Sequence, residues 1–133
     1  MTELFHLGAH AIIQNEDGKV LLLKRTYGNK GWSLPGGGVD SGESMYDALL
    51  RECIEELSVV VENIVMTGIY YHPSIRTHAA IFTCTLTENA AIQLSAEHSE
   101  YKWATLDELS KSQRIRVQDA TSFSGKVYSR VFK

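Results

Sequence analysis

The sequence predicts a single mixed α/β domain in which strands cluster around a few helices. The chain has 133 residues, the size of one domain, and 44% of them are hydrophobic against 22% charged, which is enough apolar content for a core. Strand-like segments follow one another instead of alternating strictly with helices, and this argues against a doubly wound parallel sheet. No internal repeat, low-complexity tract or linker divides residues 1–133.

The first elements that we expect are two strands joined by a tight turn. Residues 9–13 and 20–25 are mainly aliphatic, and Asp17-Gly18 between them is a turn signal typical of a β-hairpin. Residues 26–42 are rich in glycine, which suits neither a helix nor a regular strand. We therefore expect a loop there.

A helix is expected over residues 44–57, which contain no Gly or Pro, followed by a strand at the β-branched run 59–61. Residues 64–71 and 79–86 favour two paired strands around a turn at Pro73.

The last third of the chain predicts a strand at residues 100–104 and a short helix after Thr105, with Glu108 at the capping-box position. Apolar residues recur at helical spacing over 117–132, which indicates a further helix, although Gly125 weakens that pattern.

Composition and charge exclude several classes of function. The net charge of −3 argues against a protein whose main partner is nucleic acid, and favours a small or metal-bridged ligand. No apolar run is long enough for a membrane span, and no export signal is visible. The two cysteines, Cys53 and Cys84, lie among apolar neighbours and suit small core residues in a reduced compartment, so we expect a cytoplasmic protein.

The helix expected at 44–57 carries an unusual row of acids. Glu52, Glu55 and Glu56 fall within an arc of about 100° on a helical wheel. Its other side is apolar, formed by Tyr46, Leu49, Leu50, Cys53, Ile54 and Leu57. Neighbouring like charges destabilise a helix, and a hard divalent cation such as Mg²⁺ or Mn²⁺ would neutralise them. The alternative is that these acids are only solvent-facing helix formers.

The residues on either side of these acids favour a metal site over a merely solvent-facing row of acids. Residues 37–59 resemble the Nudix box, G-x5-E-x7-R-E-U-x-E-E-x-G-U with U apolar, because Gly37, Glu43, Arg51 and the three acids stand at the required spacing. Trp32 and residues 34–37 also resemble the lead-in of that family. Ser58 stands where the family has glycine, at a position that we expect to be left-handed, so it should affect stability more than chemistry.

The resemblance implies one Nudix domain over residues 1–133 with an α/β/α sandwich, in which the box helix packs on a mixed sheet. It also implies a Mg²⁺-dependent pyrophosphohydrolase, with Mn²⁺ as a substitute, that cleaves a nucleoside diphosphate linked to a group X by attack of water at phosphorus. The metal ligands it implies are Glu52, Glu55, Glu56, the backbone near Gly37, and Glu97 as a distal acid with Glu100 as the second choice. The catalytic group it implies comprises Glu52, Glu55, Arg51 and Glu43, with Glu52 serving as a ligand or as the general base.

The substrate itself stays open. Candidates for binding the base or the phosphates are Arg25, Trp32, Tyr70, Tyr71 and Arg76. A catalytically silent Nudix-like nucleotide sensor is one alternative. An enzyme acting on RNA ends or caps is another, suggested by the basic residues from Lys111 on, although a solvated basic face is the simpler explanation of these. The oligomeric state is also open, with a homodimer among the options.

Overall fold

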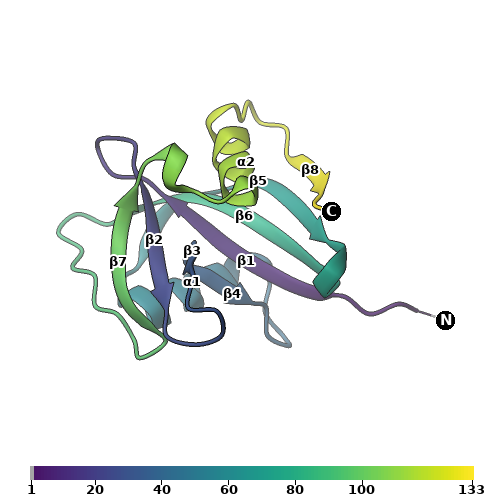
Figure 1. Cartoon of the computed structure of the whole chain (residues 1–133), viewed down its shortest axis with the longest axis horizontal. Helices are drawn as coiled ribbons and strands as arrows, with labels where there is room; N and C mark the ends of the chain where they lie inside the picture. Colours follow the sequence, from purple (N-terminus) through teal and green to yellow (C-terminus); the bar gives the residue numbers. More distant parts are fainter. Residues whose placement is uncertain (1) are drawn as a thin grey trace.

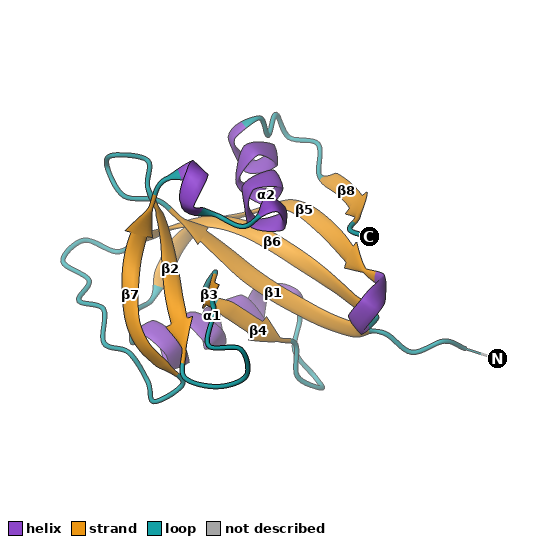
Figure 2. Ribbon diagram, in the orientation of Figure 1, coloured by secondary structure: helices purple, strands orange, loops and turns teal. Residues whose placement is uncertain are grey.

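The computed structural model describes residues 2–133 and consists of two β-sheets with a helix on each side of the larger sheet (Figures 1 and 2). The larger sheet has the strand order β4-β1-β6-β5-β8, and the smaller sheet has the order β3-β2-β7. The strands are β1 His6–Ile13, β2 Val20–Arg25, β3 Trp32–Ser33, β4 Gly36–Gly38, β5 Val61–His72, β6 Thr77–Leu86, β7 His98–Ala104 and β8 Tyr128–Val131. The helices are α1 Met45–Leu57 and α2 Lys111–Thr121, with short 3-10 turns at Pro73–Ile75 and Leu106–Glu108.

The larger sheet is mixed and separates two apolar cores. Strand β1 runs parallel to β6, and β5 runs parallel to β8, while the other neighbours are antiparallel. One core joins α1 to alternate residues of β1 such as Ala9 and Ala11, and the other contains Ile12, Tyr70 and Val117 of α2. Because side chains alternate across a strand, the two helices cover opposite faces. The α/β/α sandwich expected from the sequence is confirmed.

The two strands and the tight turn expected over residues 9–25 are confirmed, but the strands do not pair as a hairpin. Both strands exist, and the turn closes through a hydrogen bond from Gly18 N to Asn15 O at 3.0 Å. Beyond one bridge between Gln14 and Val20, however, β1 and β2 enter different sheets. Each strand finds a longer partner elsewhere, since β1 pairs with β6 and β2 with β7, and these long-range pairings outweigh the local turn signal.

The glycine-rich segment 26–42 is not a simple loop, because it contains the short strands β3 and β4. The expected strand at 59–61 and the one at 64–71 are also not separate: only Val61 belongs to a strand, and that strand is β5. β5 pairs with β6 around the turn at Pro73, which confirms that pairing.

The helix expected over residues 117–132 is wrong. Helix α2 covers Lys111–Thr121, and the chain then turns at Gly125, whose φ of 102° is closed to most other residues. The segment after it forms β8, which pairs with β5. Arg130 donates two hydrogen bonds to Asp119, and Phe132 stacks on Tyr70 at 5.2 Å between ring centroids, so specific tertiary contacts anchor the strand.

Helix α1 is fixed by its own end residues. The Ser44 hydroxyl accepts a hydrogen bond from Asp47 N at 3.0 Å, which caps the start of the helix. Ser58 ends it in the left-handed conformation with φ 58°, as expected from the sequence, and its N–H donates to Ile54 O. The Ser58 hydroxyl also donates to Gln93 O at 3.1 Å, and this hydrogen bond offsets part of the energetic cost of the left-handed backbone.

We expect Ser58→Gly to raise the free energy of unfolding by about 0.5 kcal/mol, since glycine tolerates a positive φ but loses the bond to Gln93. Denaturant unfolding of the two proteins tests this. A drop in stability of more than about 1 kcal/mol would contradict it and show that the hydroxyl contact outweighs the backbone strain.

The buried face of α1 differs from the stripe expected from the wheel. Tyr46 and Ile54, which we placed on the apolar side, are about half exposed, at 49% and 51%. In their place Ala48 and the acid Glu56 are buried. The helix therefore turns one carboxylate of the acidic row towards the interior, which matters for the site described below.

Two further expectations concern the interior and membranes. Cys53 and Cys84 are both buried free thiols in the core, as expected. Within residues 2–133, no helix has the length and apolar character needed to cross a membrane.

Candidate functional site

The glycines of β4 bring the backbone unusually close to its neighbours. Gly36 has a φ of 140°, and a Cβ there would lie 2.2 Å from the carbonyl oxygen of Ala9 on β1. A Cβ on Gly37 would lie 2.8 Å from the Glu52 Oε1 atom. Only glycine allows this close approach, and it places the Gly36–Gly37 backbone directly against the acids of α1.

We expect Gly36→Ala to destabilise the protein by more than about 3 kcal/mol, because the substitution combines backbone strain with a clash against backbone atoms. Gly38→Ala is the matched control, since a Cβ there has no neighbour within 4 Å. Thermal unfolding of both variants tests this, and only Gly36→Ala should lower the melting temperature. Equal melting temperatures would contradict the close packing of β4.

Arg51 organises the acidic cluster, a name that we use for Glu43, Glu52, Glu55 and Glu56. Its guanidinium donates hydrogen bonds to both oxygens of Glu43, at 2.7 and 2.9 Å, to Glu52 at 2.8 Å and to Glu55 at 3.2 Å. It also donates to the carbonyl oxygen of Gly38 at 3.0 Å, so it ties α1 to β4. The pair with Glu43 is bidentate, the geometry that suits arginine and that lysine cannot reproduce.

These contacts fix the ionisation of Glu43 and Arg51 at the outer part of the acidic cluster. The hydrogen bonds from Arg51, together with the one from Asp40 N, lower the pKa of Glu43 to about 2. The same contacts raise the pKa of Arg51 above its ordinary value. Glu43 and Arg51 are therefore a permanent ion pair at neutral pH.

The inner part of the cluster is Glu56, which is 4% exposed. Its Oε1 atom accepts a hydrogen bond from Gly36 N at 2.7 Å, so the carboxylate is fixed against β4. Burial raises the pKa of Glu56 to about 8, and the charges of Glu52, Glu97 and Glu55 add to this effect. Burial also raises the pKa of Glu52, although its bond to Arg51 opposes the shift.

Glu97, the expected distal acid, lies in the turn directly before β7. Its negative charge adds to the burial effects that raise the pKa values of Glu52 and Glu56. The next residue, His98, is buried, and its Nε2 atom is 3.9 Å from the Glu56 Oε2 atom. Burial lowers the pKa of His98.

The donor set suits a hard divalent cation. Glu52 and Glu55 are paired with Arg51, whereas Glu56 has no cationic partner of this kind in the part of the chain that the structure describes, and a buried carboxylate whose charge is disfavoured is what a cation would stabilise. Within residues 2–133, no three side chains of His, Cys, Asp or Glu already converge on one point. Arg51 binds Glu52 and Glu55, while Gly36 N binds Glu56, so the remaining ligands of a cation would be backbone oxygen, water and phosphate.

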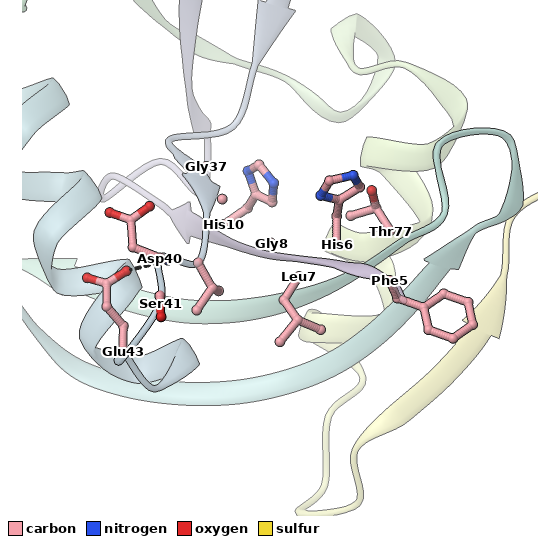
Figure 3. Close-up of a pocket in the computed structure, with 12 residues that line it drawn as sticks. Phe5, His6, Leu7, Gly8, His10, Gly37, Asp40, Ser41, Glu43 and Thr77 are labelled. Atoms are coloured by element: carbon pink, nitrogen blue, oxygen red, sulfur yellow. Dashed lines mark hydrogen bonds between the residues drawn. The ribbon is translucent and has the colours of Figure 1, made fainter. Parts of the chain in front are cut away.

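A groove of about 610 Å³ begins at the outer part of this cluster (Figure 3). Residues of the β4–α1 connection, including Asp40 and Glu43, form one end, and Phe5 lies at the other. Between them, His6 and His10 project from β1 on one side and Leu7 on the other (Figure 3). Burial lowers the pKa of His10 to about 4, with a smaller contribution from Arg116, so this imidazole is neutral at neutral pH.

The five candidate substrate-binding residues do not form one site. Tyr70 has no exposed surface, and its hydroxyl donates to Asp119 at 2.9 Å, so the expectation that it stacks on a base is wrong for this arrangement. Tyr71 and Arg76 both contact Phe5, the far end of the groove, with Tyr71 at 5.7 Å and Arg76 at 5.0 Å from its ring. Trp32 lies on the smaller sheet beneath Lys102, and Arg25 contacts Asn29 and pairs with His98 across β2 and β7.

Sequence reasoning missed two residues of this region. His10 lies on the strand next to β4, and His98 lies directly after Glu97. No local pattern points to either, because each reaches the site only through strand pairing. The adjacency of His98 to an expected ligand was the one available signal.

Comparisons with known proteins identify the family to which this fold belongs. A family model for the NUDIX domain matches residues 4–127. A protein of Bacillus subtilis (strain 168), named as a candidate 8-oxo-dGTP diphosphatase, is 32% identical over 102 residues, which are 77% of this chain and 68% of that protein. An RNA pyrophosphohydrolase of Aeromonas hydrophila is 45% identical over 53 residues, but these are only 40% of this chain and 30% of the relative.

Among solved structures, an ADP-ribose pyrophosphatase from Streptococcus suis 89-1591 superimposes with a TM-score of 0.75 and 25% sequence identity, over 97% of this chain and 100% of the other. These relatives carry names with three different substrates, so they agree on the family and on pyrophosphate-bond hydrolysis but not on the molecule cleaved. Since the family model covers nearly the whole chain, this protein belongs to the Nudix hydrolase family.

Proposed function

We propose that this chain hydrolyses the phosphoanhydride bond of a nucleoside diphosphate linked to a group X, with Mg²⁺ as cofactor and Mn²⁺ as a substitute. A nucleoside triphosphate, a modified nucleotide or an ADP-X compound would fit this class. The observation that carries the proposal is the placement of Glu52 and Glu56 against the Gly36–Gly37 backbone, with Arg51 holding the outer acids.

The cation would be held by Glu56 and Glu52, with Glu55, Glu97 and the backbone at Gly37 as further ligands, and its chemistry is to neutralise phosphate oxygens and activate water. Glu52 is our candidate for the proton acceptor. Burial raises its pKa, so it binds a proton more readily than an ordinary carboxylate, and Arg51 fixes its orientation. Glu43 acts through Arg51, because its two bonds hold the guanidinium in place.

The groove gives the nucleoside a place next to these acids. Its end at Glu43 lies within the Arg51 network, while its far end offers the ring of Phe5, supported by Tyr71 and Arg76. A base or sugar at the far end would place its phosphates near Gly37 and the acids.

Two other functions remain as alternatives. A nucleotide sensor without turnover would need a damaged site, and every acid of the box is in place. An RNA-end pyrophosphohydrolase would use the basic residues of the last part of the chain. Arg114, Arg116 and Arg130 instead contact other groups of the protein, which reduces the charge that this segment can offer to a phosphate backbone.

A screen of product release tests the proposal. The purified protein is incubated with Mg²⁺, and separately with Mn²⁺, together with nucleoside triphosphates, oxidised nucleotides, ADP-ribose, dinucleoside polyphosphates, nucleotide sugars and 5′-triphosphate RNA. Products are identified by mass. We expect turnover of at least one small nucleotide that stops with EDTA. No turnover, together with a rise in melting temperature on adding nucleotide, would favour the sensor instead.

A further inference from the structure

His98 is a buried imidazole that the proposed chemistry does not yet use. It is the first residue of β7, and its side chain is only 2% exposed. Buried imidazoles normally have hydrogen-bond partners for their ring nitrogens. Among residues 2–133, the Nδ1 atom of His98 has none. Packing alone therefore explains this residue poorly.

The other ring nitrogen points towards the acidic cluster. His98 Nε2 is 3.9 Å from Glu56 Oε2, while the second oxygen of Glu56 is occupied by the bond from Gly36 N. A separation of 3.9 Å is too long for a hydrogen bond. Two ligands that each lie about 2.1 Å from one cation are about 3.0 Å apart when adjacent and about 4.2 Å apart when opposite, so the observed spacing falls within the range for a shared ion.

The surroundings of His98 also suit a cation. On α1 it faces Glu56, and in the sequence it directly follows Glu97, the other expected ligand on this side of the site. Arg25 pairs with His98 across β2 and β7, and its guanidinium donates to Asn29. An imidazole among carboxylates adds a nitrogen donor to an otherwise oxygen-based site.

We propose that His98 is a nitrogen ligand of the divalent cation held by Glu56, and that it raises the affinity of this site for Mn²⁺ more than its affinity for Mg²⁺. The proposal rests on the metal site of the proposed function and adds to it. Imidazole is a good ligand for transition metals, whereas Mg²⁺ favours oxygen, so one buried histidine shifts the preference between the two ions.

The test is pulsed electron paramagnetic resonance on the full-length protein with one equivalent of Mn²⁺. We expect modulation from a directly bound ¹⁴N nucleus in the native protein and its loss in His98→Gln. His78→Gln is the matched control and should keep the signal, because His78 stacks on Tyr71 outside the acidic cluster. Calorimetric titration should show a loss of Mn²⁺ affinity of roughly 10-fold or more in His98→Gln, and a smaller loss for Mg²⁺.

The outcomes separate the two proposals. Stoichiometric Mn²⁺ binding with oxygen ligands alone in the native protein would overturn the role of His98 and leave the hydrolase intact. An absence of any Mn²⁺ or Mg²⁺ binding would instead overturn the metal site itself. The native spectrum decides the question even if His98→Gln folds poorly, which circular dichroism would reveal.

Discussion

Glu56→Gln should remove nearly all turnover, by more than roughly 100-fold in kcat, while the protein stays folded. The glutamine oxygen can still accept the hydrogen bond from Gly36 N, so the packing of α1 on β4 is kept. A neutral amide cannot replace the charge of a carboxylate that binds a cation. Steady-state kinetics with Mg²⁺ and with Mn²⁺ measure the effect.

The same substitution should stabilise the metal-free protein at alkaline pH. The folded protein holds the pKa of Glu56 at about 8, above the ordinary value of 4.5, so folding favours the protonated acid. The stability from this group is present below about pH 4.5 and is lost as the pH rises towards 8. Glutamine does not ionise, so the variant should exceed the native protein by roughly 2 to 4 kcal/mol at pH 8 in EDTA and match it near pH 4.5.

Glu62→Gln is the control for both measurements, because Glu62 is an exposed residue of β5 outside the acidic cluster. It should change neither kcat nor the pH dependence of unfolding. Native turnover in Glu56→Gln, at an unchanged melting temperature, would show that the carboxylate has no part in the reaction.

Arg51→Lys should lower kcat by roughly 100-fold with a smaller effect on KM, since a misplacement of catalytic groups by about 1 Å has costs of that size. A lysine ammonium cannot hold both oxygens of Glu43 together with Glu52 and the Gly38 carbonyl. The orientation of Glu52 would then be lost while its charge remains.

Arg114→Lys provides the comparison, because the Arg114 guanidinium also donates to backbone, at the carbonyls of Leu106 and Leu109, but lies on α2, away from the acids. Its kcat should stay at the native value. Adding Glu43→Gln to Arg51→Lys should cost less than the two separate effects combined, since both residues belong to one hydrogen-bonded network. Full additivity would contradict the positioning role of Glu43.

Helix α1 could be predicted from the sequence because its signals are local. Ser44, the uninterrupted helical segment and Ser58 fix its ends, and the spacing of the acids fixes which of them share a face. The burial of Glu56 could not be predicted in this way. It depends on β4 lying against α1. Because β4 consists of three glycines, no side-chain pattern in the sequence indicates that contact.

Strand pairing explains the other errors. The sequence contains β1, β2 and the turn between them, yet their partners, β6 and β7, lie far along the chain. The end of the chain was misjudged for the same reason, because β8 gains its structure from β5, Asp119 and Tyr70. His98 became recognisable as part of the site only once β7 was placed beside α1.

The two outer strands of the larger sheet also affect how readily the protein aggregates. β4 has three residues and β8 has four, whereas the strands they cover, β1 and β5, have eight and twelve. Very short edge strands are poor templates for pairing with another molecule, so this sheet resists edge-to-edge aggregation. The anchoring of β8 by Arg130 and Phe132 therefore also protects the protein at high concentration, by keeping part of the β5 edge covered.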